Sequence, residues 1–554
     1  MLHGYITGVA GRRDIPAEGV LVLCADLYRE EGSSFAGRLN GSFVLAIEDL
    51  AREELRLVSD RLGTRNAYFH QAAGSCSYAN RLEAIRRVDP SIADNASGST
   101  LALFFTFGRS LEGSMLEGVS VLAPACILTY DGVALKEERY WRPSFSYSAA
   151  RLGIEDNARR LSRAMEATVV DSTRGWKSTG LLLSGGLDSR MVLSFLGGHD
   201  VTCYTACDRR NLETWIAEKA ARRAGAAHVR LSRNVEHYLR ILPRAVRVCE
   251  GGYEYDHDHL EGLWEPFGGS EDRVVLSGYG MNSIMRTFAL CALDVSPSSR
   301  SRDGQVTRGL DGVKAVGESL FDLFASEHDS LATMAPALRR DAAGYPREAL
   351  ARFLAPYESC VESPVDLFDV YLLAHVSRTR TFPFIESLRQ RFPERCPSFD
   401  NRIVSLALST PPQQRFDSRV FRRALMLRDP RLALLIDANS GFPAALGGNA
   451  ALLSRRALKS AERVPTAIKK RLSRHEGLWL QKAGSWHDPG LLWRWSGLWK
   501  ELDTLLGDEA ATRDGLVSAD GVRGLLRSHL EGRGHHHIVL TRVLSFLACR
   551  RSWE

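Results

Sequence analysis

A short apolar run followed at once by a glycine-rich turn is the feature that most restricts how this chain can fold. Leu181, Leu182 and Leu183 lead directly into the turn Ser184–Ser189, and the segment Arg190–Leu196 then suits a helix. This order predicts a buried strand, a tight turn and a helix, with glycines that let a ligand approach the backbone closely. Because amides at the start of a helix attract anions, we expect a phosphate group to bind at this turn.

The turn differs from the commonest phosphate-binding loop. It lacks the Gly-Lys-Ser/Thr ending of the Walker pattern, and its two glycines are adjacent. It does contain Asp188, whose carboxylate is the kind of oxygen ligand that Mg²⁺ takes beside nucleotide phosphates. The turn therefore predicts a nucleotide site with Mg²⁺ near Asp188.

Length and composition limit the classes of protein that remain. The chain has 554 residues, which suits two or three domains. Its longest apolar stretches fall well short of the roughly 20 residues that a membrane helix needs. The ten cysteines form no paired Cys-x-x-Cys clusters, and the formal net charge is only +6. We expect a cytoplasmic protein with reduced thiols that binds neither membranes nor nucleic acid.

The pattern of elements changes near residue 145. Before it, short β-rich runs alternate with Gly and polar turns, which predicts an antiparallel-sheet domain over residues 1–145. From residue 146, strands alternate with helices, which predicts an α/β domain with a doubly wound parallel sheet and its ligand at the carboxyl ends of the strands. Beyond about residue 320 the sequence is mainly helical. We expect this second domain to extend over residues 146–554.

Several motifs, in order, resemble the asparagine synthetase family. The segments similar to its N-terminal glutaminase half are Leu39–Phe43, Ser59–Arg65, Tyr78–Asn80 and Arg139–Trp141, and the Ser184–Ser189 turn resembles the family's pyrophosphate-binding loop. The resemblance implies an Ntn-amidotransferase-like domain followed by an ATP-pyrophosphatase (PP-loop) synthetase domain. Members split ATP between the α and β phosphates to make an acyl-adenylate.

The first residues depart from the family pattern. Family members begin Met-Cys-Gly-Ile, and the cysteine is the nucleophile that hydrolyses glutamine. Here the chain begins Met1-Leu2-His3-Gly4, so His3 stands where that cysteine is expected. An imidazole cannot replace a terminal thiol and its own α-amine as nucleophile and base. We expect the domain to keep its fold without glutaminase activity.

A second loop of the family falls on Ser277–Ser283. Family members carry Ser-Gly-Glu/Asp-Gly-x-Asp-Glu, whereas this chain has Tyr279 between Gly278 and Gly280. That tyrosine resembles the one in β-lactam and carbapenam synthetases, which pairs with a glutamate and deprotonates an attacking amine. A free tyrosine has a pKa of about 10, so the role requires a charged neighbour. Tyr279 is therefore a candidate base, and a tyrosine that only packs over the nucleotide is the alternative.

The partners of Tyr279 stay open at this point. The resemblance places a glutamate before the segment Arg395–Asp400, where Glu386 and Glu394 are both available as catalytic partners. A lysine of the related synthetases is missing from the segment Asp437–Gly441. The arginines that could replace it are Arg378, Arg380 and Arg395.

The resemblance also predicts the binding residues. Asn282 stands where the family has a second Mg²⁺-binding aspartate, so the metal residues are Asp188 and Asn282, the latter a weaker, uncharged ligand. Glu213 matches an acidic position near the adenosine. The residues expected to bind ATP and pyrophosphate are Leu183, Ser184, Gly185, Gly186, Leu187, Asp188, Ser189, Gly278 and Gly280.

These features together predict an ATP- and Mg²⁺-dependent ligase that makes an amide from a carboxylate and an amine. The resemblance extends to lasso-peptide cyclases, which form a macrolactam, and the long, Trp-rich, basic C-terminal region favours a peptide substrate. The expected partners are a peptide or small molecule carrying both groups and a peptidase that processes a precursor peptide. The alternatives are a β-lactam or carbapenam type of synthetase, an ammonia-dependent ligase, and a nucleotide-binding scaffold without catalysis.

Overall fold

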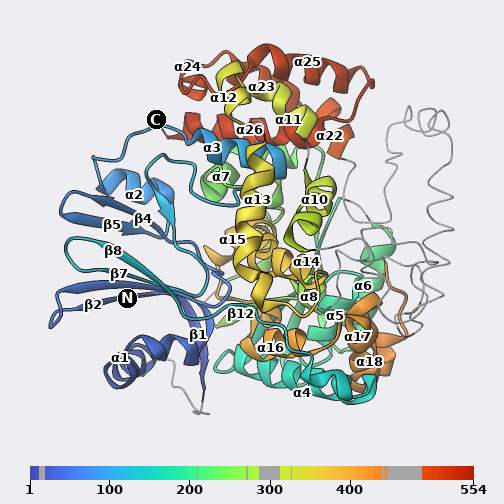
Figure 1. Cartoon of the computed structure of the whole chain (residues 1–554). Coiled ribbons are helices and arrows are strands. Elements are labelled where there is room, and N and C mark those ends of the chain that lie inside the picture. Colours follow the sequence, from blue (N-terminus) through green and yellow to red (C-terminus); the bar gives the residue numbers. More distant parts are fainter. Residues whose placement is uncertain are drawn as a thin grey trace.

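The computed structural model describes residues 1–10, 19–208, 210–269, 272–285, 312–325, 327–342, 344–438, 443, 445 and 489–553. The N-terminal sheets form one side of the molecule, helices surround a parallel sheet on the other, and the last helices lie across both (Figure 1). The predicted α/β class is confirmed.

The N-terminal part contains two antiparallel sheets. The larger has the order β1 (Leu2–Val9), β2 (Leu39–Asp49), β3 (Glu54–Ser59), β7 (Cys126–Tyr130) and β8 (Leu135–Arg139). The smaller has the order β5 (Ser75–Ala79), β4 (Tyr68–Ala72) and β6 (Ser120–Val121). Alternate residues of β2 and β3 point to opposite faces, so the larger sheet buries one face under α1 (Val20–Glu31) and the other against β4.

The second sheet is parallel throughout. Its order is β11 (Ala227–Ser232), β10 (Asp200–Cys207), β9 (Ser178–Leu182), β12 (Arg273–Ser277) and β13 (Glu394–Arg395). The helices among these strands are α4 (Ile154–Thr173), α5 (Leu187–Leu193), α6 (Leu212–Arg223), α7 (His237–Cys249) and α8 (Met281–Ile284). The strand order runs outward from β9 in both directions, so the carboxyl ends of β9 and β12 flank the switch point where such sheets bind ligands.

Helices make up most of the described chain after residue 311. Those before the last described segment are α10 (Gly312–Phe324), α11 (Glu327–Thr333), α12 (Pro336–Asp341), α13 (Tyr345–Leu354), α14 (Asp366–Tyr371), the π-helix η8 (Leu372–Thr381), α15 (Pro383–Arg389), α16 (Asn401–Ser409), α17 (Pro412–Arg415), α18 (Arg419–Arg428) and α19 (Pro430–Ala433). Strand β13 is the exception that the sequence did not predict.

The last helices bridge the two sheet regions. They are α22 (Pro489–Trp495), α23 (Leu498–Leu506), α24 (Glu509–Thr512), α25 (Ala519–Leu530) and α26 (His537–Ser552). Helix α26 packs on α7 and on α3 (Gly98–Phe107) of the N-terminal part, where Phe105 and Phe546 meet edge to face at 6.1 Å between ring centroids. The guanidinium of Arg542 donates to the carbonyl of Phe105 at 2.7 Å and pairs with Glu254 at 3.0 Å.

In the described residues, none of the helices combines the length and the apolar composition needed to cross a bilayer. The proposed division at residue 145 stays a prediction, since Leu103 and Phe107 from the N-terminal part belong to the same hydrophobic core as the parallel sheet.

Candidate active site

The turn between β9 and α5 is held in shape by hydrogen bonds among its own residues. The Ser184 N–H donates to Ser189 Oγ at 3.0 Å, and the Gly186 N–H donates to Ser184 Oγ at 3.2 Å. The two serine hydroxyls lie 3.1 Å apart. These hydrogen bonds join both ends of the turn and restrict its backbone, and a restricted backbone lowers the entropy cost of binding a phosphate there.

Arg190 holds the same turn through hydrogen bonds to its carbonyl groups. The motif did not predict this role. Its fully buried guanidinium donates to the carbonyls of Gly186 at 2.9 Å and Gly185 at 3.3 Å, and on its other side to those of Leu432 at 3.0 Å and Leu435 at 3.1 Å. In a trans peptide the N–H points away from the carbonyl. The Gly186 carbonyl is turned toward Arg190, so the N–H of the same peptide, that of Leu187, points to the opposite side.

The loop after β12 lies directly against the loop after β9. A Cβ on Gly278 would stand only 2.7 Å from the Ser189 nitrogen and 2.8 Å from the Asp188 carbonyl carbon. Gly280 has φ of +87°, and a Cβ there would overlap the ring of Phe399. Gly278 is thus required by close backbone approach, and Gly280 by the Phe399 side chain and by its own conformation. The two predicted loops meet as the switch-point geometry implies.

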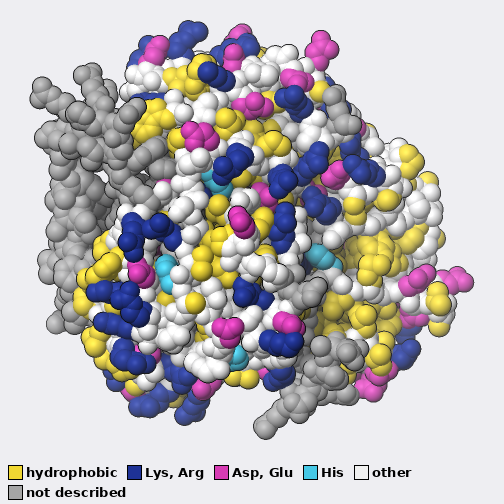
Figure 2. Space-filling model, turned by 180° about the vertical axis from the view of Figure 1, so that it is seen from behind, with side chains coloured by type: hydrophobic (Ala, Val, Ile, Leu, Met, Phe, Trp, Pro, Cys, Tyr) yellow, Lys and Arg dark blue, Asp and Glu magenta, His cyan; other side chains and the backbone are white. Residues whose placement is uncertain are grey.

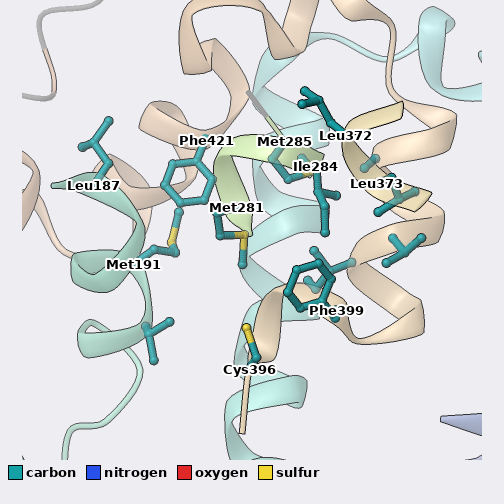
Figure 3. Close-up of a cluster of buried hydrophobic side chains, with 14 of the residues drawn as sticks. Leu187, Met191, Met281, Ile284, Met285, Leu372, Leu373, Cys396, Phe399 and Phe421 are labelled. Carbon is teal, nitrogen blue, oxygen red and sulfur yellow. The ribbon is translucent and has the colours of Figure 1, made fainter. Parts of the chain in front are cut away.

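One apolar cluster anchors the helices that follow both loops (Figure 3). Leu187 and Met191 of α5 lie in it with Met281 of α8, Met285 at the end of that helix, and Phe399. All five side chains are buried in one continuous core. Because interiors are close-packed, a shift of one helix is felt by the other. The cluster therefore couples the position of the Ser184–Ser189 turn to that of Tyr279.

The carboxyl end of β10 brings Glu213 to the turn. Glu213 lies in the first turn of α6, and its Cα and Cγ would stand 3.1 Å from a Cβ on Gly185. The capping box formed by Asn211 and Thr214 fixes this helix start. Glu213 therefore lies beside the predicted phosphate loop, on the same edge of the sheet.

A buried cation, Arg233, lies just after the carboxyl end of β11. The sequence alone did not identify this residue as part of the site. Arg233 Nη2 pairs with Asp208 Oδ1 at 2.7 Å, and Nη1 donates to the hydroxyl of Tyr238 at 2.9 Å. The pair is almost fully buried, in a setting where charges act strongly on their neighbours. Its position at the end of a predicted parallel strand is the signal by which the sequence could have identified it.

Tyr279 lies between these groups. Its ring packs on Phe384 with 5.6 Å between centroids, and its carbonyl accepts from the Cys396 thiol at 3.1 Å. Burial, and after it the Glu213 carboxylate, raise the pKa of Tyr279 to about 12, while Arg233 acts in the opposite direction. The hydroxyl is therefore protonated near neutral pH. It can donate a hydrogen bond or relay a proton, but it is not a phenolate.

Glu386 and Glu394, the two predicted partners of Tyr279, both pair with Arg389. Arg389 Nε lies 3.0 Å from Glu394, and Nη1 lies 3.3 Å from Glu386. The acid whose charge acts on Tyr279 is instead Glu213. The catalytic role predicted for Glu386 or Glu394 stays a prediction.

Arg389 belongs to the wall of a large cavity between the N-terminal part and the parallel-sheet domain. The cavity has a volume of about 790 Å³ and is also lined by His3, Arg65 and Glu386. Burial, and after it the charge of Arg65, lower the pKa of His3. His3 itself lies in β1, paired with Val44 of β2. His3, which the sequence analysis matched to the family cysteine, thus lines this cavity.

The predicted metal residues are only partly described. Asp188 is half-buried in the first turn of α5, beside Gly278. Asn282 lies in α8, but its side chain is outside the described residues. Among the side chains that the structure does describe, no three His, Cys, Asp or Glu residues form a group that could hold a metal ion.

The candidates for the missing lysine lie mostly elsewhere. Arg378 donates to the carbonyls of Gly63 at 3.2 Å and Leu122 at 3.2 Å in the N-terminal part, and Arg395 lies 3.7 Å over the ring of Tyr5. The side chain of Arg380 and the residues 439–441 lie outside the described residues. The cation that the structure places near Tyr279 is Arg233.

Comparison with protein families gives two matches, in the order that the motifs predicted. Residues 18–141 match the family described as glutamine amidotransferase domain, and residues 160–286 match the family described as asparagine synthase. None of the curated proteins matches the chain. The two matches support the asparagine synthetase family, and the second supports an ATP-dependent ligase that forms amide bonds.

Proposed function

We propose that this protein activates a substrate carboxylate with MgATP, releases pyrophosphate, and transfers the acyl group from the adenylate to an amine. The observation that carries the proposal is the meeting of two loops at the switch point of the sheet, with Gly278 against Ser189 and Glu213 against Gly185. The turn proposed to bind phosphate and the groups proposed to carry the proton thus lie at one edge of the sheet, as a two-step acyl transfer requires.

The first step needs the turn and Asp188. A carboxylate oxygen of the substrate bonds to the α-phosphorus, and the bond from that phosphorus to the bridging oxygen breaks, which releases pyrophosphate. The backbone amides around Leu187 would receive the phosphates. Mg²⁺ at nucleotide sites is typically held by phosphates and one or two carboxylates, and Asp188 would provide one.

The second step needs a proton acceptor. The amine attacks the carbonyl carbon, AMP leaves with its bonding electrons, and the amine loses a proton. Tyr279 is protonated near neutral pH because its pKa is about 12. We therefore assign it the role of a relay that passes the proton toward Glu213, rather than that of a base by itself.

We further propose that the amine does not come from glutamine. His3 occupies the position that the resemblance predicts for the nucleophilic cysteine, and an imidazole does not replace a thiol nucleophile there. An amine carried by the substrate itself is the natural alternative, which makes the product a lactam. A macrolactam in a ribosomally made peptide, as made by lasso-peptide cyclases, is the narrower form of the proposal.

The first test is calorimetric titration of MgATP into the wild-type protein and into Asp188→Ala. We expect binding that requires Mg²⁺ and that the substitution weakens at least tenfold, about 1.4 kcal/mol. Asp200→Ala is the matched control, since Asp200 is an exposed aspartate at the opposite, amino end of β10. Absence of MgATP binding by the folded wild type would contradict the proposed ligase function.

The second test separates the lactam from an ammonia-dependent ligase. Peptides with a free N-terminal amine and an internal Asp or Glu would be incubated with MgATP and analysed by mass spectrometry. Loss of one water together with formation of AMP supports the lactam. Product formation only with added ammonium salts contradicts it.

A further inference from the structure

A second cavity lies on the surface where the N-terminal part meets the parallel-sheet domain. It has a volume of about 490 Å³, and its walls come from α2 (Leu82–Val88), α7 and the residues after α15. Its arginines are Arg81, Arg87, Arg244, Arg247 and Arg391, and its acids are Glu83 and Glu261. We call this cavity the arginine cleft. Lys and Arg side chains gather in groups on the face seen in Figure 2, with acidic and apolar side chains among them.

The charges of the arginine cleft are only partly compensated. Arg87 lies 2.6 Å from Glu83, Arg244 lies 3.8 Å from Glu261, and Arg81 lies 3.6 Å from the buried Glu250. Arg247 and Arg391 have no carboxylate within ion-pair distance among the described residues. Both are exposed. The arginine cleft therefore has at least two guanidinium groups available to a ligand.

Two of these arginines, Arg87 and Arg244, contribute little to the stability of the fold. The side chains of Arg87 and Arg244 are each 72% exposed, so their ion pairs are screened by water. Like charges held close together repel one another, and an anion bound between them would remove that cost. Guanidinium groups match carboxylates in a bidentate geometry. The chemistry of the arginine cleft is thus that of an anion site.

The position of the arginine cleft connects it to the candidate active site. Helix α15 carries Phe384, which packs on Tyr279, and the chain then continues to Gln390 and Arg391 in the cleft wall. At a rise of about 1.5 Å per residue this path is roughly 10 Å long. About three extended residues span that length. A polypeptide could therefore occupy the arginine cleft while a nearby part of it reaches Tyr279.

We infer that the arginine cleft binds an acidic segment of the peptide substrate and holds it while another part reacts. The inference rests on the proposed function for the identity of the peptide. Two features favour a peptide over a nucleic acid: Glu83 and Glu261 interrupt the positive wall and would repel a continuous phosphate backbone, and Ala84 and Val248 provide apolar surface. Separate carboxylates on a flexible chain can pair with the arginines and avoid the acids.

The test measures peptide binding without any reaction. A fluorescein-labelled octaglutamate peptide is titrated with the full chain, and binding is followed by fluorescence anisotropy at low and physiological salt. We expect binding at least tenfold tighter than that of the octaglutamine peptide, weakening as salt rises. The double variant R247E/R391E should lose at least tenfold in affinity and should bind MgATP as the wild type does.

The matched control is R340E/R527E, which makes the same change of charge at two exposed arginines of the helical region. It should change peptide affinity less than twofold. Equal loss in the control pair, or no loss in R247E/R391E, overturns the inference. Displacement of the peptide by inorganic phosphate or by short RNA at equal or lower concentration also overturns it, because the arginine cleft would then be a site for small anions or nucleic acid.

The two proposals can fail separately. If the wild type binds MgATP but not the acidic peptide, the inference about the arginine cleft is wrong and the proposed function is untouched. If the peptide binds at the arginine cleft but MgATP does not bind, the cleft holds an acidic polypeptide as inferred, and the proposed ligase function loses its support.

Discussion

Replacement of Arg190 by lysine keeps the positive charge and removes the planar fork, so it tests whether hydrogen bonds to the loop carbonyls shape the phosphate turn. Four carbonyls accept from Arg190, at 2.9, 3.0, 3.1 and 3.3 Å, and they lie on two sides of the guanidinium. A lysine ammonium presents its donors around one nitrogen and can serve one side only. At least two buried carbonyls should then lose their partner.

The size of the effect follows from that count. Each buried acceptor left without a donor costs about 1–3 kcal/mol, so Arg190→Lys should lower the free energy of unfolding by about 3 kcal/mol. The change is measured by urea unfolding. MgATP affinity, measured by calorimetry, should fall at least tenfold, because the turn that carries the Leu187 N–H loses the hydrogen bond from Arg190 to the Gly186 carbonyl.

Arg340→Lys is the control for this experiment, since Arg340 is exposed and a surface exchange of this kind changes stability by less than about 0.5 kcal/mol. A result in which Arg190→Lys stays within about 1 kcal/mol of the wild type and binds MgATP equally well would refute the reasoning. It would mean that the turn holds its shape through the bonds between Ser184 and Ser189 alone.

Three further results are expected. Gly278→Ala should destabilise the fold by about 1–3 kcal/mol and weaken MgATP binding, because the new Cβ meets the backbone at 2.7 Å; Gly197→Ala, with nothing within 4 Å, should change neither. Burial raises the pKa of Glu250 from 4.5 to about 7, so the folded protein holds this proton more tightly than the unfolded chain does. The contribution of protonated Glu250 to the free energy of unfolding is therefore full below about pH 4.5 and is lost as the pH rises through 7. Relative to Glu250→Gln, the wild type should therefore lose up to about 3 kcal/mol of unfolding free energy between about pH 5 and pH 8. Equal pH profiles of the two proteins in urea unfolding would contradict this. Asn40→Ala removes bonds to Asp400 at 2.8 Å and to the Asn401 N–H at 2.9 Å, and should cost about 1–3 kcal/mol in the same assay.

The parts of the fold that could be predicted from the sequence are those set by local pattern. A strand, a glycine turn and a helix are neighbours in the chain, so the segment Leu181–Leu196 predicted their order. The observed helix, Leu187–Leu193, begins three residues earlier than the predicted Arg190, inside the turn. The alternation of strands and helices after residue 146 likewise predicted the parallel sheet, and the carboxyl-end rule then placed Gly278–Gly280 beside the turn.

The parts that could not be predicted depend on contacts between distant residues. Arg190 lies 242 positions from Leu432, its partner in space, and nothing in the local pattern of α5 distinguishes it from a solvated helix charge. Strand β13 consists of Glu394 and Arg395 alone, too short for any periodicity to appear. In both cases the tertiary fold, rather than the local sequence, decides the structure.

Tyr279 shows most clearly where sequence reasoning ends. From its place between two glycines it could be selected as a proton carrier, but the rise of its pKa above the ordinary 10 comes from burial, to which Phe384 and Cys396 contribute from more than a hundred positions later in the chain. With a pKa of about 12 it holds its proton near neutrality. In the proposed reaction the proton of the attacking amine therefore needs another acceptor, and Glu213, brought to the same edge by a different strand, is the acid whose charge raises the pKa of the tyrosine. The chemistry of the site thus follows from which strands are neighbours, and not from the residues adjacent to Tyr279 in the sequence.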